Sequence, residues 1–260
     1  MKKTEKMKFR LLESKPVEDS YKKMAVDEAI LRAVSKQRVK PTLRFYRWNK
    51  PAVAIGYFQS TEKEVDVEKC KQDNVEIFRR MTGGGAVYKD PGGELNYSVI
   101  APETMGEIPS DIQETYRKIN KFIISALEEL GIKAKHSGIN DITINNQKIS
   151  GSAQTRKKGT LLQHGTLLLD FNPNKMIKYL KIPIEKSKDK TTSKIEDRVT
   201  TLKQIKSNLT MNSLKETLKQ NFEEEFNCEL VREGLTKWER EKADELHRKK
   251  YSTKEWNYMK

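Results

Sequence analysis

The sequence contains only two cysteines among its 260 residues, Cys70 and Cys228. They form no CxxC pair and cannot supply a disulfide framework, so we expect both to be buried thiols. No apolar run approaches the roughly 18 residues that a membrane-spanning helix needs. The basic segment 1–15 also lacks an apolar stretch long enough for a signal peptide. These absences predict a cytoplasmic protein with no membrane partner.

Acidic residues are fewer than basic ones, 37 Asp and Glu against 51 Lys and Arg, which gives a net charge of +14. Such a balance raises the question of nucleic-acid binding. However, the lysines are spread along the chain, and the aromatic residues do not alternate with them. This distribution argues against a dedicated nucleic-acid role. The charge is more simply explained by a solvated surface or by attraction to an acidic protein partner.

Glycine is concentrated in one short stretch, residues 79–90, which read RRMTGGGAVYKD. Three consecutive glycines favour neither helix nor strand, because glycine loses the most backbone freedom on ordering. The apolar residues on either side predict a strand, a glycine turn and a second strand. Bare backbone N–H groups beside arginines suit an anionic ligand such as a phosphate. A glycine-rich hairpin without a ligand is the alternative, since the spacing matches neither the P-loop nor the Rossmann pattern.

A second informative stretch, residues 140–166, reads NDITINNQKISGSAQTRKKGTLLQHGT. Its alternating residues predict a hairpin with a tight turn at Asn145 and Asn146, followed by a third strand. These antiparallel strands would place Asp141, Lys148 and His164 in one local sheet. The strands expected in the whole chain are 9–12, 42–48, 53–55, 75–78, 86–88, 95–100, 141–144, 148–152, 160–169 and 229–232.

Helices are expected where apolar residues recur at three- and four-residue spacing. The clearest case runs from Ile112 to Leu130 and is ended by Gly131. Ser20 could cap the first helix. Residues 184–201 have almost no hydrophobic side chains, which predicts a mobile loop. The other expected helices are 65–74, 172–179, 212–226 and 236–251.

Together, the two stretches resemble the lipoate–protein ligase A family of the biotin/lipoate ligase superfamily. The family pattern is RRxxGGGxVxHD, an Asn-Asp strand, K-[IV]-[SA]-G-[SA]-A and H-G-[TS], and this chain has each block in that order. The resemblance implies an α/β (α+β) fold with mixed, largely antiparallel sheets flanked by helices. It also implies one catalytic domain over residues 1–260, without a C-terminal accessory domain. Because the sequence stops after KYSTKEWNYMK, the archaeal-type two-component form is expected, in which a separate small accessory protein completes the enzyme.

The activity implied by the resemblance is ATP-dependent lipoate–protein ligation. The enzyme would use ATP and Mg²⁺ to convert (R)-lipoate into lipoyl-AMP, and would then transfer the lipoyl group to a lysine. The acceptors would be lipoyl domains of 2-oxoacid dehydrogenases and the glycine-cleavage H protein. The chain alone is expected to bind lipoate and nucleotide but to activate lipoate poorly.

The same resemblance assigns the site. Lys148 would be the catalytic cation at the α-phosphate, and Asp141 the carboxylate near magnesium. His164 is either a general base or a residue that fixes backbone near the pocket. The expected nucleotide- and lipoyl-adenylate-binding residues are Arg80, Gly84, Gly85, Ala86, Val87, Tyr88, Asn140, Asp141, Lys148, Gly151, Ala153 and His164. Lys89 departs from the family, which usually has histidine there, and a lysine cannot accept a hydrogen bond as neutral imidazole does.

Two alternatives stay open from the sequence. Octanoyl and lipoyl transferases share the scaffold but use a catalytic cysteine, in one branch just upstream of the lysine block. That region here reads KHSGINDITINN and has no cysteine, which favours the ligase, although the GSAQTRKKGTLLQHG segment resembles the transferases. The second alternative is a non-enzymatic basic binding module.

Overall fold

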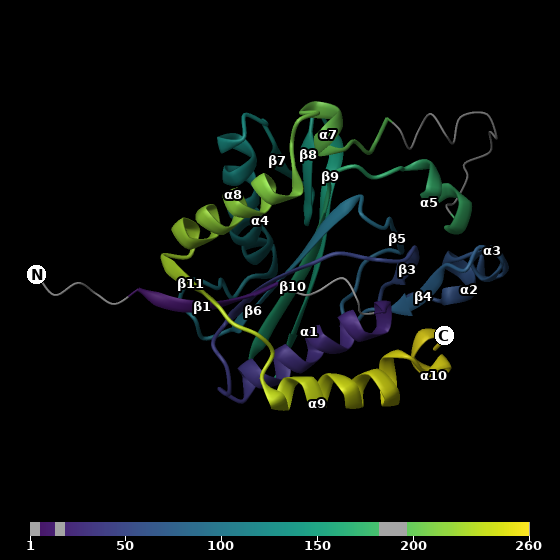
Figure 1. Cartoon of the computed structure of the whole chain (residues 1–260), viewed down its shortest axis with the longest axis horizontal. Helices are drawn as coiled ribbons and strands as arrows, with labels where there is room; N and C mark the ends of the chain where they lie inside the picture. Colours follow the sequence, from purple (N-terminus) through teal and green to yellow (C-terminus); the bar gives the residue numbers. More distant parts are fainter. Residues whose placement is uncertain (1–5, 14–18, 182–196, 260) are drawn as a thin grey trace, which may run out of the picture.

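The computed structural model describes residues 6–13, 19–181 and 197–259. This part of the chain forms two β-sheets, one of eight strands and one of three, with helices around them (Figure 1). Within the described ranges, no helix is long and apolar enough to cross a membrane.

The larger sheet has the strand order β11-β1-β2-β6-β10-β9-β8-β7. The two pairings made by β1 are parallel and the other five are antiparallel. The predicted α/β fold with largely antiparallel sheets is therefore confirmed. The strands are β1 (Met7–Glu13), β2 (Thr42–Tyr46), β6 (Glu94–Pro102), β7 (Lys135–Ser137), β8 (Asp141–Ile144), β9 (Gln147–Lys157), β10 (Thr160–Leu168) and β11 (Cys228–Arg232).

The smaller sheet corrects one of the sequence interpretations. Its strands are β3 (Ala52–Ile55), β4 (Glu76–Arg79) and β5 (Val87–Lys89), and β3 lies in the middle. β4 runs parallel to β3 and β5 runs antiparallel to it. The glycine stretch is therefore not a hairpin turn, because its flanking strands are not neighbours. It crosses the end of β3 from one edge of the sheet to the other.

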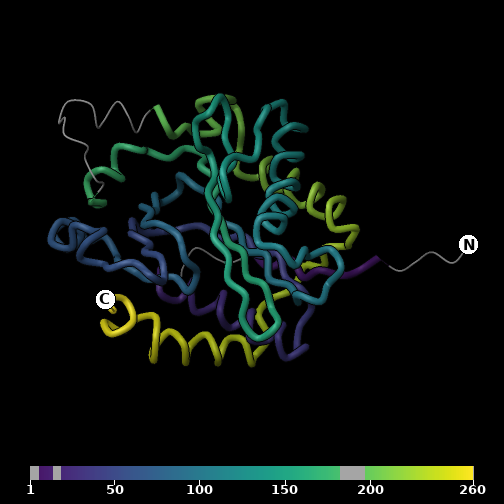
Figure 2. Tube along the Cα trace, turned by 180° about the vertical axis from the view of Figure 1, so that it is seen from behind, coloured from purple at the N-terminus to yellow at the C-terminus, as the bar shows by residue number. Residues whose placement is uncertain are grey.

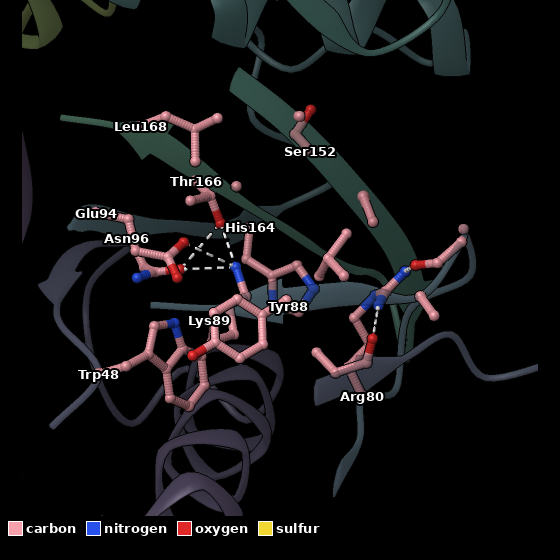
Figure 3. Close-up of a pocket in the computed structure, with 18 of the residues that line it drawn as sticks. Trp48, Arg80, Tyr88, Lys89, Glu94, Asn96, Ser152, His164, Thr166 and Leu168 are labelled. Atoms are coloured by element: carbon pink, nitrogen blue, oxygen red, sulfur yellow. Dashed lines mark hydrogen bonds and ion pairs between the residues drawn. The ribbon is translucent and has the colours of Figure 1, made fainter. Parts of the chain in front are cut away.

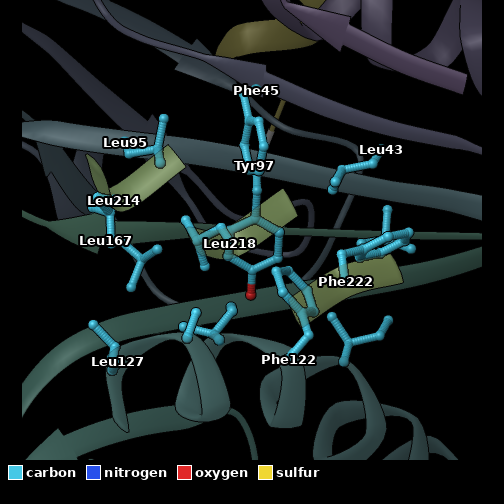
Figure 4. Close-up of a cluster of buried hydrophobic side chains, with 14 of the residues drawn as sticks. Leu43, Phe45, Leu95, Tyr97, Phe122, Leu127, Leu167, Leu214, Leu218 and Phe222 are labelled. Carbon is cyan, nitrogen blue, oxygen red and sulfur yellow. The ribbon is translucent and has the colours of Figure 1, made fainter. Parts of the chain in front are cut away.

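One face of the larger sheet is covered by α4 (Ile112–Glu129) and α8 (Met211–Glu225). Asp111 caps α4 by accepting a hydrogen bond from the backbone of Glu114, and Gly131 follows its end with a φ of 77°. The predicted amphipathic helix is confirmed. Its buried residue Phe122 meets Tyr97 of the sheet and Phe222 of α8 edge to face (Figure 4). Such aromatic pairs stabilise a core beyond the area that they bury.

On the other side of the molecule, α1 (Ser20–Ser35) and α9 (Lys237–Leu246) pack side by side, as both views show (Figures 1 and 2). Asp19, and not Ser20, caps α1. The α1 helix contributes to a second hydrophobic cluster together with strands of both sheets. The remaining helical elements are α2 (Thr61–Glu64), α3 (Val67–Gln72), α5 (Asn174–Tyr179), α7 (Leu202–Ile205), the π-helical turn η2 (His247–Tyr251) and α10 (Lys254–Asn257).

Several element boundaries differ from the sequence predictions. The tight turn at Asn145 and Asn146 is confirmed, because both residues have positive φ angles. The strand expected to end at residue 152 continues to Lys157, because pairing with β10 extends it through polar residues that give no apolar signal. The short elements α2, α7, β7 and α10 were not predicted. Most of the loop predicted for residues 184–201 lies outside the described residues.

A buried ion pair ties the C-terminal helices to the larger sheet. The Arg10 guanidinium on β1 donates two hydrogen bonds, of 2.8 and 2.6 Å, to the Glu239 carboxylate on α9. Both side chains are completely buried. Burial opposes ionisation of Glu239, but the bonds from Arg10 and the Thr236 backbone hold the pKa of its carboxyl below the usual value.

We expect Glu239→Ala to lower the free energy of unfolding by about 3–5 kcal/mol, because it leaves the Arg10 charge buried without a partner. The matched control is Glu241→Ala on the same helix, whose ion pair with Lys237 is exposed and 3.8 Å long. That control should change stability by less than about 0.5 kcal/mol. Urea unfolding of both variants measures the difference, and equal effects would contradict a structural role for the buried pair.

Candidate active site

A cavity of about 320 Å³ opens where the two sheets approach each other. The larger sheet supplies one side, and the smaller sheet with the glycine stretch supplies the other (Figure 3). The lining residues are Met24, Tyr46, Trp48, Ala54, Phe78, Arg80, Gly84, Gly85, Ala86, Val87, Tyr88, Lys89, Glu94, Asn96, Asn140, Lys148, Gly151, Ser152, Ala153, His164, Gly165, Thr166, Leu168, Phe171, Met176 and Val199.

The polar side of the cavity follows from the strand register. Tyr46, Asn96, Thr166, Gly151 and Asp141 stand opposite one another on the successive strands β2, β6, β10, β9 and β8. Residues directly opposite in antiparallel strands point to the same face of a sheet. One row of residues, drawn from five strands, therefore lies across the cavity.

Lys148 lies above this row at Gly151. A Cβ atom added to Gly151 would come within 2.7 Å of the Lys148 Nζ, so glycine is required where the amine passes over the backbone. The amine forms an ion pair of 2.7 Å with Asp141, and both side chains are partly exposed. On its other side, the Lys148 backbone bonds to Arg198 and Thr200. The described end of the loop predicted for residues 184–201 therefore lies against Lys148.

Lys89 lies on β5 of the smaller sheet, and its buried amine contacts Asn96 and Thr166 of this row. Its amine donates to Glu94 at 3.3 Å, to Asn96 at 3.2 Å and to Thr166 (Figure 3). Burial lowers the pKa of the Lys89 amine although Glu94 opposes the shift, and burial raises the pKa of Glu94 although Lys89 opposes that. The residue that departs from the family pattern thus has three acceptors within this chain.

The guanidinium groups of Arg80 and Arg79 donate hydrogen bonds to backbone carbonyl oxygens. The Arg80 guanidinium donates to the carbonyl oxygens of Gly83 and Gly85 at 2.8 Å, and burial lowers its pKa to about 10. Gly84 between them has a φ of 92°, a backbone conformation that favours glycine. Arg79 is completely buried and is not among the lining residues. Of the two arginines that begin the glycine stretch, only Arg80 therefore lines the cavity.

His164 belongs to a buried chain of hydrogen bonds that the sequence did not reveal. One ring nitrogen lies 2.7 Å from the Thr82 hydroxyl, and the other lies 3.4 Å from the Asp27 carboxylate. Asp27 also pairs with Arg44 at 2.6 Å and accepts from Ser98 at 2.9 Å. Burial lowers the pKa of His164, although Asp27 opposes the shift. Asp27 lies on α1 and Thr82 just before the glycines, so no sequence spacing connects them.

The structure brings together nearly all of the residues that the sequence pointed to. Eleven of the twelve line the cavity, and Asp141 touches it through Lys148. Sequence reasoning missed Asn96, Thr166, Glu94 and Trp48. The alternation in LNYSVI carried a signal for Asn96, because Leu95 and Tyr97 face the opposite, apolar side. The individual roles of the residues stay predictions.

Metal binding by the protein and catalysis by a cysteine thiolate both lack support among the described residues. No group of three or more His, Cys, Asp or Glu side chains there could hold a metal ion, and Asp141 is a single carboxylate paired with Lys148. Cys70 and Cys228 are buried as predicted, and neither lines the cavity. Burial raises the pKa of each thiol to about 12, which disfavours the reactive thiolate.

Comparison with known proteins defines the class of enzyme. Residues 19–223 match the lipoyl protein ligase A/B catalytic domain, and the chain belongs to that family. A curated relative, the octanoyltransferase LipM of Anoxybacillus flavithermus, is 34% identical, with 91% of this chain and 93% of LipM covered. Further relatives with the same name are 31–35% identical.

Solved ligase structures are also similar. The archaeal bipartite lipoate protein ligase of Thermoplasma acidophilum is 33% identical, with a TM-score of 0.86, and the match covers 98% of this chain and 96% of that one. A lipoate-protein ligase A solved with ATP is 31% identical, with a TM-score of 0.83, over 97% and 98% of the two chains. An enzyme of the lipoate/octanoate transferase–ligase group is thus supported, in place of the non-enzymatic binding module.

The prediction of an ATP-dependent lipoate–protein ligase is wrong. The curated relatives, matched over most of their length, are octanoyltransferases. The sequence argument gave too much weight to one absent cysteine upstream of Lys148, and too little to the transferase-like segment after it. The two-component organisation, which belonged to the ligase interpretation, is not confirmed by these relatives.

The buried imidazole of His164 predicts a pH dependence of stability. Its pKa in the folded state lies below the ordinary value of 6.5, so the unfolded chain binds the extra proton more readily. Stability should therefore fall as the pH drops below about 6.5 and on towards the folded pKa. His164→Gln should make the loss of stability between pH 7.5 and 5.5 shallower, as measured by urea midpoints.

The control is His136→Gln, at a half-buried histidine that bonds to Asn120 away from the cavity. This variant should retain the contribution of His164, and so a steeper loss than His164→Gln. If the two variants show the same pH profile, His164 is not held neutral by the fold.

Proposed function

We propose that this chain is an acyltransferase that moves an octanoyl or lipoyl group from a thioester donor to a lysine of an acceptor lipoyl domain. The observation that carries the proposal is the position of the Lys148 amine, above bare backbone at Gly151 and 2.7 Å from Asp141. The names of the curated relatives support this chemistry. A lipoyl domain or the glycine-cleavage H protein fits as the acceptor, since the chain's +14 charge attracts an acidic partner.

The proposed reaction begins with the acyl chain in the cavity and its carbonyl beside Lys148. Apolar side chains from both sheets and from α1 line the cavity around this position, and they exclude water from the acyl chain. The positive charge of Lys148 stabilises the oxygen as negative charge develops on it. Losing one such group typically lowers the rate about 100- to 1000-fold.

The acceptor amine then attacks the carbonyl carbon directly. A C–N bond forms and the C–S bond to the donor breaks. The proton lost by the amine ends on the departing thiolate, so the step balances without a nucleotide. We favour direct transfer over an acyl-cysteine intermediate, because both thiols are buried outside the cavity.

The decisive test uses the full chain, octanoylated acyl carrier protein and a lipoyl domain, without ATP. We expect the lipoyl domain to gain one octanoyl group by mass spectrometry. The chain itself should gain none, and Cys70→Ala and Cys228→Ala should retain transfer. Modification only with free octanoate or lipoate plus Mg-ATP would overturn the proposal, and an acyl group trapped on either cysteine would overturn direct transfer.

Gly151→Ala tests the position of the amine. The new methyl group would displace the flexible end of Lys148, so the chain should fold normally while transfer falls about 100-fold. Gly106→Ala is the matched control, since a Cβ there meets nothing within 4 Å and the backbone is not in a glycine-specific conformation. Transfer rates and thermal unfolding of both variants are compared, and unchanged transfer in Gly151→Ala would contradict the proposed role of Lys148.

A further inference from the structure

The two most exposed large apolar side chains in the described part of the chain are Phe58 and Ile139, at 72% and 58%. Both lie beside the opening of the cavity. Among the lining residues, Gly84 and Gly85 are exposed and Asn140 is partly exposed. The cavity therefore opens between the glycine stretch and the start of β8. Single exposed apolar residues are common on protein surfaces, so the location of these two is the informative observation.

Phe58 belongs to the loop after β3, which packs against the glycine stretch. A Cβ atom added to Gly56 would lie 1.9 Å from the Gly84 carbonyl oxygen, so the two backbones are in direct contact. A Cβ atom added to Gly83 would lie 3.8 Å from the Phe58 ring. Phe58 therefore stands beside the glycines that form one side of the opening.

Ile139 stands on the other side of the opening. It directly precedes Asn140, which lines the cavity. The Ser152 backbone N–H on β9 donates to the Asn140 carbonyl oxygen at 3.2 Å, and the Ser152 hydroxyl donates to the same oxygen at 3.1 Å. These bonds fix the turn between β7 and β8, so the position of Ile139 relative to the opening is also fixed.

The loop that carries Phe58 is held by hydrogen bonds. The Arg79 guanidinium donates to the carbonyl oxygens of Gly56, Tyr57 and Gln59 at 2.9, 3.0 and 2.7 Å. The Phe58 ring also packs edge to face against the Tyr57 ring, with centroids 4.9 Å apart. Ordering loops and side chains at an interface opposes binding, so a ring on a loop that is already ordered is favourable to bury against a partner.

The proposed reaction places a partner on this rim. The acyl carbonyl lies beside the Lys148 amine, and the Lys148 side chain is 40% exposed, so the reacting atoms are near the opening. The Cα of an acceptor lysine is at most about 7.5 Å from its amine, because five bonds of about 1.5 Å join them. The acceptor backbone must therefore come down to the opening. A folded domain there buries about 800 Å² on each partner, which extends beyond the opening onto its rim.

We infer that Phe58 and Ile139 are the apolar contacts on which the acceptor lipoyl domain docks, one on each side of the opening. The inference rests on the proposed function, since it takes the acceptor to be a folded domain whose lysine enters this cavity. The partner would present apolar side chains on both sides of that lysine. The exposed Lys157 amine lies 5.4 Å from the centre of the Tyr57 ring, so a cation next to Phe58 suits an acidic partner.

Binding of an unacylated lipoyl domain to the full chain tests the inference without any transfer step. Phe58→Ser and Ile139→Ser should each weaken binding at least about tenfold, because truncating an anchor residue of an interface has effects of this size. Ile205→Ser is the matched control and should bind like the unchanged chain. Ile205 is also exposed, at 42%, but the next residue, Lys206, bonds to Leu130 at the end of α4, on the face of the larger sheet away from the cavity. Equal binding by all three variants would overturn the inference.

Transfer kinetics separate docking from chemistry, and the acceptor from the donor. In Phe58→Ser the KM for the lipoyl domain should rise at least about tenfold, while kcat and the KM for octanoylated acyl carrier protein change less than about twofold. A rise in the KM of the carrier alone would assign this surface to the donor and overturn the inference. A lower kcat with an unchanged KM for the lipoyl domain would place Phe58 in the acyl site and overturn it as well. Thermal unfolding verifies that each variant is folded, and Ile139→Ser provides the same test from the other side of the opening.

The outcomes distinguish this inference from the proposed function. Lipoyl-domain binding that depends on Phe58 and Ile139, without transfer from any carrier, would reject the acyltransferase and leave the docking surface intact. Transfer by the unchanged chain and by both variants with equal KM for the lipoyl domain would support the enzyme and reject the docking surface.

Discussion

The close approach of the Lys148 amine to the backbone at Gly151 is the contact on which the site depends. The strand register makes it possible, because it places Gly151 in one row with Thr166 and Asp141. A side chain at Gly151 would occupy the space of the amine. Pairing of β8, β9 and β10 therefore determines both the fold of this region and the place of its central charge.

Charged side chains near Lys148 are buried as pairs of opposite sign, and this pairing stabilises them. Lys89 is bonded to Glu94, and Asp27 to Arg44, so each of these four buried charges has a partner of opposite sign. A buried ion left alone would be strongly unfavourable. These pairs leave Lys148 as a partly exposed cation beside a carboxylate of similar exposure. The charges at Lys89 and Glu94 are therefore neutralised inside the protein, while the Lys148 amine keeps part of its surface exposed in the cavity.

The sequence predicted the site residues that belong to local motifs. It did not predict those that distant segments bring together in the fold. The hairpin at Asn145 and the block that contains Lys148 could be recognised directly. Asp27 and Thr82 could not, because their contacts with His164 arise from packing of α1 and the glycine stretch against β10. The order of the smaller sheet was missed for a similar reason, since strands adjacent in sequence need not be adjacent in space. The choice between ligase and transferase rested on one residue type, and similarity over the whole chain corrected it.

The Arg79 guanidinium joins parts of the chain that are synthesised far apart. It donates to the carbonyl oxygens of Gly56, Tyr57 and Gln59, which lie beside the glycine stretch. It also donates to carbonyl oxygens of Trp256 and Met259. During translation, this cluster of bonds cannot close until residue 259 has left the ribosome. The backbone beside the glycine stretch therefore gains this set of hydrogen bonds only after the strands of both sheets have been synthesised.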